Sequence, residues 1–328
     1  MILAGDIGGT NTRLALFAGT ADRLEVVAME VYPSPAHKGL EEIALKFRAQ
    51  HAEPADAAAF GIAGPVRNGR CETPNLPWIV DESAVSAALG IRPVKLINDL
   101  EANAHGIHVL EEKDFSTLAE GSGEAQGNRV LISAGTGLGE AGLLADSGDY
   151  RPYASEGGHA DFAPRNETEI ELLRYLLKQF DHVSFERVLS GPGLFNIYKF
   201  LRDTGRASES GSLAEELAKR DPSAVISTHA LDGSSELCVQ ALNQFVSIYG
   251  AEAGNLALKG MATGGVFLGG GIAPKILPKL REPVFLEAFR AKGRVSKILQ
   301  AIPVRVILND KTALLGAGRV AMMAAGLR

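Results

Sequence analysis

An acidic residue followed by a glycine pair gives the sequence its first chemically distinctive stretch, close to the amino terminus. Glycine has no Cβ, so backbone N–H groups in a Gly-Gly turn can approach an anion closely, and neighbouring hydroxyl and amide groups add hydrogen bonds. Asp6 precedes this pair, and an acid beside a phosphate requires a divalent cation between them, for which Mg²⁺ suits carboxylate oxygen. We therefore predict a phosphate-binding turn with Asp6 as a Mg²⁺ ligand, partly through water. The residues expected at the nucleotide are Gly5, Asp6, Ile7, Gly8, Gly9, Thr10 and Asn11.

Two further glycine-rich turns follow apolar runs in the same manner. The stretch 128–144 repeats the plan of apolar strand, glycine and threonine turn, and apolar strand that 2–17 shows, which indicates two related halves that each begin with a β-hairpin. The alternative is that these glycines make only tight turns between strands. The residues expected at the nucleotide from the later turns are Gly135, Thr136, Gly137, Gly269, Gly270 and Gly271.

The segment 137–142 also matches the G-x-G-x-x-G pattern of dinucleotide-binding proteins. That pattern requires a helix immediately afterwards, whose N-terminus faces the pyrophosphate. Here 141–145 is followed by Asp-Ser-Gly-Asp, which leaves too few residues for a helix and favours a hairpin strand. No G-x-x-x-x-G-K-[ST] run occurs either, so we predict neither a dehydrogenase nor a P-loop enzyme.

The three glycine-rich turns, in this order and spacing, resemble those of the bacterial glucokinase family, within the superfamily of hexokinases, actin and sugar kinases. The resemblance covers essentially the whole chain. It implies an α/β fold with two ribonuclease-H-like lobes, as in actin-like ATPases and hexokinase. Each lobe is expected to be a mixed β-sheet with flanking helices, and the active site is expected in the cleft between the lobes. The expected small lobe is 1–110 with about 301–328, and the large lobe is 111–300.

The resemblance also implies an activity, which is the ATP-dependent phosphorylation of D-glucose at its 6-hydroxyl. A hexose presents several hydroxyls, and a cluster of carboxylates, amides and an imidazole is the kind of site that can pair them. Asp99 is expected to be the general base, and Mg²⁺ bound with ATP is the expected cofactor. The residues expected at the sugar are Asn98, Asp99, Glu156, His159, Glu186 and Asn75.

Each of these polar residues also has a purely structural interpretation. Asp99 could be the N-cap of a helix beginning near residue 100, and Asn75 could serve only a proline-bracketed turn. His159 could be a loop histidine bonded to backbone, and Glu186 could be a first-turn acid favoured by the helix dipole. Residues alone leave these alternatives open.

Two other functions remain possible within the same superfamily. A kinase of mannose, fructose or an N-acetyl amino sugar, or one using ADP or polyphosphate, would carry similar motifs. A sugar-responsive regulator is the less favoured alternative, because it would need a DNA-binding segment before the first hairpin, which starts at Ile2. Some relatives carry a cysteine-rich zinc motif after Glu-x-x-His, whereas 160–164 reads Ala-Asp-Phe-Ala-Pro, so we expect no zinc.

Composition limits the partners and the compartment. The 328 residues carry a formal net charge of −6, which argues against nucleic acid as a partner. The two cysteines lie far apart in the sequence, and we expect buried thiols. There is no apolar run near the ~18 residues of a membrane span and no basic leader before Gly5, so we expect a cytoplasmic protein that does not bind membranes. Long helices in the second half and the family resemblance favour a homodimer.

Overall fold

The structure, a computed structural model, describes residues 1–74, 76–123, 126–146 and 148–327. It divides into two compact units. Unit 1 comprises residues 1–114, 152–154 and 309–328, and unit 2 comprises residues 115–151 and 155–308. Within the described ranges, no helix is both long enough and apolar enough to span a membrane. Both cysteines are free and buried, as predicted.

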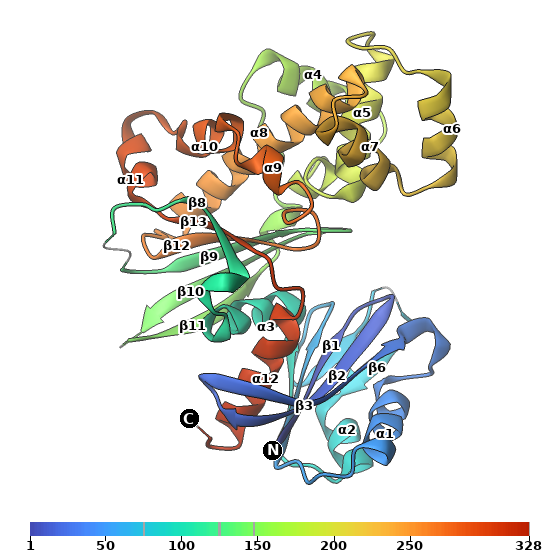
Figure 1. Cartoon of the computed structure of the whole chain (residues 1–328), viewed down its shortest axis with the longest axis vertical. Helices are drawn as coiled ribbons and strands as arrows, with labels where there is room; N and C mark the ends of the chain where they lie inside the picture. Colours follow the sequence, from blue (N-terminus) through green and yellow to red (C-terminus); the bar gives the residue numbers. More distant parts are fainter. Residues whose placement is uncertain (75, 124–125, 147, 328) are drawn as a thin grey trace. The chain divides into compact units, whose positions relative to one another are not determined.

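Unit 1 is built on a five-stranded sheet with the order β3-β2-β1-β4-β7 (Figure 1). The first three strands are antiparallel neighbours, and β1, β4 and β7 run parallel. A separate small hairpin pairs β5 with β6. The strands are β1 (Ile2–Ile7), β2 (Asn11–Thr20), β3 (Arg23–Pro33), β4 (Ala57–Ile62), β5 (Arg70–Glu72), β6 (Ile79–Asp81) and β7 (Val94–Asn98).

Helices cover both faces of this sheet, which explains the nearly continuous apolar character of β1. Alternate residues of β1 enter different cores: Leu3 packs with the residues of α1 and α2, and Ile2 packs with those of α12. The helices are α1 (Leu40–Gln50), α2 (Glu82–Leu89), α3 (Asp99–Gly106) and α12 (Thr312–Ala324), and the single 3₁₀ turns are η1 (Ser34–Ala36), η2 (Ile107–Val109) and η3 (Glu112–Asp114).

Unit 2 contains a six-stranded sheet with the order β11-β10-β9-β12-β13-β8 (Figure 1). β9 and β10 form an antiparallel hairpin, and β12 runs parallel to β9 and to β13. The strands are β8 (Phe115–Ala119), β9 (Arg129–Ala134), β10 (Leu138–Asp146), β11 (Asp149–Ser155), β12 (Gly265–Gly269) and β13 (Val304–Ile307).

The long helix α8 is the centre of the helical part of unit 2. It packs on the sheet through β9 and β12 and is itself contacted by α5, α7 and α10. The helices are α4 (Glu167–Leu176), α5 (Gly191–Asp203), α6 (Gly211–Lys219), α7 (Pro222–Leu231), α8 (Glu236–Lys259), α9 (Leu277–Leu280), α10 (Pro283–Arg290) and α11 (Ser296–Ala301), with 3₁₀ turns η4 (Gly157–His159), η5 (Phe185–Arg187) and η6 (Gly293–Val295).

The two sheets share one plan, which confirms the predicted relation between the halves of the chain. In each, an antiparallel hairpin (β1 with β2, or β9 with β10) is followed by a strand parallel to its first member (β4 or β12). The segment 141–145 lies in strand β10, which confirms that no dinucleotide-binding helix follows the G-x-G-x-x-G pattern.

Residues 301–308 lie in unit 2, whereas the sequence placed them with the small lobe. The reason is that β13 pairs with β12 on one side and with β8 on the other, so it completes the second sheet.

Candidate active site

Three parallel strands of unit 1 end at one edge of the sheet and bring the predicted acids to it. Ile7 of β1, Ile62 of β4 and Asn98 of β7 are register partners, so Asp6 and Asp99 lie at the same carboxyl edge. Their strands are separated by β4, which corresponds to about 10 Å across the sheet. The carboxyl edge is where ligands bind in layered α/β sheets.

Asn98, rather than Asp99, is the N-cap of α3. Its Oδ1 accepts hydrogen bonds from the N–H groups of Leu100 (2.9 Å) and Glu101 (3.4 Å), while its Nδ2 donates to the carbonyl oxygen of Gly64 (3.1 Å). Asp99 is the first helical residue, and its Oδ1 accepts from the N–H of Leu100 at 3.0 Å. The capping interpretation of Asp99 is therefore wrong.

The glycine-rich turn after β1 is held by a residue that sequence reasoning did not identify, Ser34 of η1. Its Oγ donates to the carbonyl oxygen of Gly8 (2.7 Å), and its N–H donates to that of Thr10 (2.9 Å). Within the turn, the N–H of Gly8 donates to the carbonyl oxygen of Asn11 (3.0 Å). Ser34 is completely buried, and it lies between two prolines, Pro33 and Pro35, which predict from the sequence only a break in the strand pattern.

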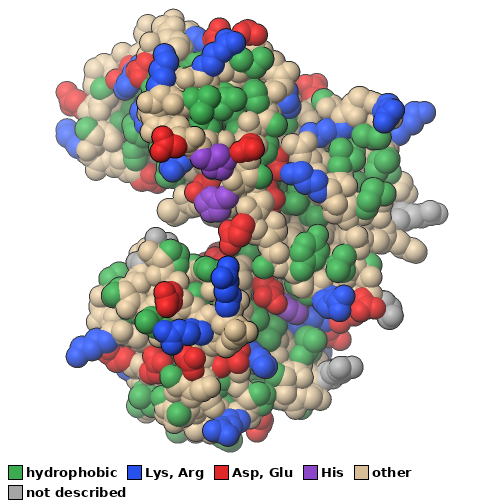
Figure 2. Space-filling view, turned by 180° about the vertical axis from the view of Figure 1, so that it is seen from behind, with side chains coloured by type: hydrophobic (Ala, Val, Ile, Leu, Met, Phe, Trp, Pro, Cys, Tyr) green, Lys and Arg blue, Asp and Glu red, His purple; other side chains and the backbone are tan. Residues whose placement is uncertain are grey.

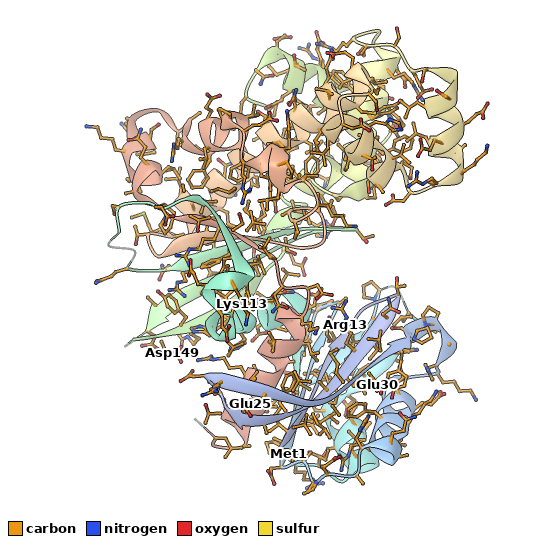
Figure 3. All side chains as sticks on the ribbon, viewed as in Figure 1. Met1, Arg13, Glu25, Glu30, Lys113 and Asp149 are labelled. Carbon is orange, nitrogen blue, oxygen red and sulfur yellow. The ribbon has the colours of Figure 1, made fainter. Side chains whose placement is uncertain are left out.

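Asp6 has an electrostatic environment suited to a bound cation. Burial raises the pKa of its carboxyl, Arg13 lowers it and Asp310 raises it. Arg13, labelled in Figure 3, is the register partner of Asp6 on β2, but its guanidinium is bound to the Asp310 carboxylate at 2.9 Å. A divalent cation would offset the cost of ionising Asp6. Since Mg²⁺ commonly uses one or two carboxylates together with phosphate oxygens and water, this donor set fits it.

In unit 2, the second and third glycine-rich turns contact each other. Gly269 of β12 is the register partner of Ser133 on β9, and the N–H of Ile272 donates to the carbonyl oxygen of Ala134 at 3.2 Å. Gly270 has a φ of +80°, and a Cβ there would lie 2.3 Å from the same carbonyl oxygen. Only glycine fits this close approach of two backbones.

The turn between β9 and β10 is closed by backbone hydrogen bonds. The N–H of Gly135 donates to the carbonyl oxygen of Gly137 at 2.9 Å, and the N–H of Gly191, at the start of α5, donates to the carbonyl oxygen of Gly135 at 2.8 Å. Together with the contact at Ala134, these bonds make one continuous glycine-rich surface from parts of the sequence more than 130 residues apart.

Two of the predicted sugar-binding residues of unit 2, His159 and Glu186, line one cavity, whereas Glu156 is not among its lining residues. Residues 160–162 and 183–185 run side by side, through hydrogen bonds from Phe162 N–H to the carbonyl oxygen of Val183 (2.9 Å) and from Phe185 N–H to that of Ala160 (3.0 Å). A cavity of about 380 Å³ results. It is lined by His159, Gln179, Phe180, Asp181, His182, Ser184, Glu186 and Arg187. Figure 2 shows histidines beside acidic side chains on this unit.

Glu186 joins this cavity to the second glycine-rich turn. Its Oε2 accepts a hydrogen bond from the N–H of Leu138 at 2.9 Å, and a Cβ on Gly137 would lie 2.6 Å from that oxygen. The sequence of residues 184–189 predicts the start of a short helix, whereas the structure has only the 3₁₀ turn η5 there, whose Phe185 is buried. Glu156 precedes η4, and its carbonyl oxygen accepts from the N–H of His159 at 3.0 Å. Asn75 lies outside the described residues.

Comparisons with known proteins agree on one family. The family model described as Glucokinase matches residues 3–324. The glucokinase of Nostoc sp. (strain PCC 7120) is 43% identical over 333 residues, which cover 97% of each chain. The crystal structure of a glucokinase from an Antarctic psychrotroph has a TM-score of 0.86 and 31% identity and covers 98% of each chain. At 22% identity, the glucokinase of Balamuthia mandrillaris in complex with glucose shows the same fold, with a TM-score of 0.79 over 99% of this chain and 93% of that one.

Proposed function

Because the chain belongs to the glucokinase family, we propose that it transfers the γ-phosphoryl group of ATP to the 6-hydroxyl of D-glucose, with Asp99 as the general base. The observation that carries the assignment of Asp99 is its place at the carboxyl edge of the sheet that also ends in Asp6. A carboxylate at this edge is of the residue type that can accept the proton of the sugar hydroxyl.

Positioning and charge neutralisation do most of the work in phosphoryl transfer. The glycine-rich turns at 5–11, 135–137 and 269–271 let the triphosphate approach the backbone closely, where N–H groups other than those of Gly8 and Gly135, which are bonded within the turns, donate to it. When bound with ATP, Mg²⁺ would be held by Asp6, partly through water, and would neutralise charge on the phosphate oxygens. Asn98, Glu156, His159 and Glu186 bind the glucose hydroxyls. Asp99 removes the proton from the attacking hydroxyl.

A coupled assay tests the substrate assignment. Glucose, mannose, fructose, glucosamine and N-acetylglucosamine would each be supplied with ATP, ADP or polyphosphate. We expect glucose with ATP to give the highest kcat/KM. A higher value for another pair would replace the substrate while leaving the kinase assignment intact, and absence of phosphorylation for every pair would reject the proposed function.

Glu186 should control glucose affinity. Replacing it with alanine removes a carboxylate that lines the cavity and accepts from the N–H of Leu138. A hydrogen bond to a charged group contributes about 1.5–3 kcal/mol, so we expect KM for glucose to rise about 10- to 100-fold. Initial rates at saturating ATP measure this. Glu215→Ala, at a side chain 77% exposed on α6, is the matched control, and an equal effect in both variants would contradict the role of Glu186.

Gly270→Ala tests the contact between the two glycine-rich turns of unit 2. The methyl group would lie 2.3 Å from the carbonyl oxygen of Ala134, at a φ of +80° that side chains disfavour. Strain of this kind costs about 1–3 kcal/mol, and we expect KM for ATP to rise about tenfold or more. Gly211→Ala is the control, since a Cβ there meets nothing within 4 Å. An unchanged KM for ATP would show that this turn does not contribute to nucleotide binding.

We also propose that the protein acts in the cytoplasm as a homodimer. The family resemblance and the commonness of twofold oligomers support the dimer. Light scattering coupled to gel filtration at several concentrations measures the mass in solution, and a species of 34.6 kDa throughout would reject it.

A further inference from the structure

The first residues of β10 support both segments that carry the sugar-binding side chains of unit 2. The N–H of Leu138 donates to Glu186, as described above, and the carbonyl oxygen of Leu138 would lie 2.0 Å from a Cβ on Gly158. Two residues further along the same face of the strand, Oε2 of Glu140 would lie 2.0 Å from a Cβ on Gly157. The turn η4 therefore rests on β10 through two adjacent glycines.

Glu140 is an unusual residue for such a support. Its side chain is 1% exposed, and its Oε1 has no hydrogen-bond partner among the described residues. Two charged groups of α8 act on it: Glu252 raises the pKa of its carboxyl and Lys259 lowers it, while burial has the largest effect and brings the pKa to about 7. A buried carboxylate with an unpaired oxygen destabilises a fold, so packing alone does not account for glutamate at this position.

We propose that Glu140 is a positioning residue for glucose binding, because its carboxyl group fixes the position of Gly157 and thereby the orientation of Glu156 and His159. This inference rests on the proposed function. Glu140 also follows Gly137 by only three residues, so the same strand places the sugar-binding turn relative to the glycine-rich turn of unit 2. The residue belongs to neither set of predicted contacts, and the sequence offered no signal for it beyond a charge within an apolar strand.

A pair of conservative variants separates positioning from a general structural role. Glu140→Asp withdraws the carboxyl group from Gly157 by one methylene, whereas Glu140→Gln keeps its length and shape. Since misplacement of a binding group by about 1 Å can cost up to about 100-fold, we expect Glu140→Asp to raise KM for glucose at least tenfold. Glu140→Gln should restore KM to within about threefold of the wild type. Glu169→Asp is the matched control at a second buried carboxylate, one that does not act on Glu140, and its KM for glucose should not change.

A double-mutant cycle tests the contact independently of how well the aspartate variant folds. Gly157→Ala introduces the methyl group that meets Oε2 of Glu140, and Glu140→Ala removes that oxygen. If the contact positions Gly157, the fold-increase in KM for glucose in the double variant should be smaller than the product of the fold-increases in the two single variants, by at least about fivefold. The inference would be overturned if the fold-increases in KM of the two single variants simply multiply, or if the Glu140→Asp and wild-type proteins have equal KM values for glucose. Either outcome leaves the proposed function standing as long as the wild-type protein phosphorylates glucose. A wild-type protein inactive on glucose would reject that function itself.

Discussion

Replacing Asp99 with alanine is expected to lower kcat by about 10² to 10⁴-fold, the range for removal of a general base. The variant should remain folded, because the cap of α3 is supplied by Asn98 and survives the change. Asp99→Asn provides a closer comparison, since it keeps the side-chain volume and removes only the ability to take a proton. Steady-state kinetics with glucose and ATP measure both variants, and circular dichroism checks the fold.

The kinetic pattern of these variants is as informative as its size. A base that acts only in the transition state should lower kcat and kcat/KM together and leave KM for ATP near its wild-type value. Asp22→Asn, at a carboxylate 81% exposed in the same unit, is the control for general charge effects. Near wild-type kcat in Asp99→Ala would overturn the assignment of the base.

The hairpins and parallel strands that position the turns were predictable from the sequence, because their signals are local. Two apolar runs on either side of a glycine pair indicate a hairpin, and a short run before Asp-Ser-Gly-Asp cannot hold a helix. Both expectations are confirmed by the pairing of β1 with β2 and of β9 with β10. Apolar residues at helical spacing predict a helix at 40–50, and a run rich in Ala, Leu and Met predicts one at 312–325; both coincide with α1 and α12 to within one residue.

Features that depend on distant partners were not predictable in the same way. The sequence Thr168-Glu169-Ile170-Glu171 fits a capping box and predicts that a helix begins there. That prediction is wrong, since Asn166 is the N-cap of α4 and accepts from the N–H of Glu169 at 3.0 Å. Glu169 is completely buried and pairs with Arg165, so its role in the core shifts the start of the helix. Ser34 supports the first glycine-rich turn from 26 residues away. Such contacts leave no periodic trace in the sequence.

The candidate site shows the same division between local motif and distant support. Glycine pairs, the Asn-Asp pair at the end of a strand and Glu-Gly-Gly-His are visible as local motifs. The contact of Gly270 with Ala134, and that of Glu140 with Gly157, arise only when separate strands meet. Residues that bind ligands were therefore easier to propose from the sequence than residues that hold them in place.

Glu140→Gln is expected to make the protein more stable at alkaline pH, although the glutamine fills the same space. Burial raises the pKa of the Glu140 carboxyl from 4.5 to about 7 in the folded state. Between these values the folded protein retains a proton that the unfolded chain releases, so the free energy of unfolding falls as pH rises. Above pH 7 the penalty levels off at about 3 kcal/mol, since each pKa unit corresponds to 1.36 kcal/mol.

The difference in the free energy of unfolding between variant and wild type, measured by calorimetry at pH 5, 6, 7 and 8, reports Glu140 together with its coupling to Glu252 and Lys259, because the other titrating residues are common to both proteins. We expect the free energy of unfolding of Glu140→Gln to exceed that of the wild type only slightly at pH 5 and by about 3 kcal/mol at pH 8. Glu215→Gln, at an exposed side chain, should show no such trend. A difference that stays constant with pH would mean that Glu140 does not titrate near neutrality. The expected trend would instead show that the strand supporting the sugar-binding turn carries a carboxyl group at a cost in stability, which is the behaviour of a residue retained for function.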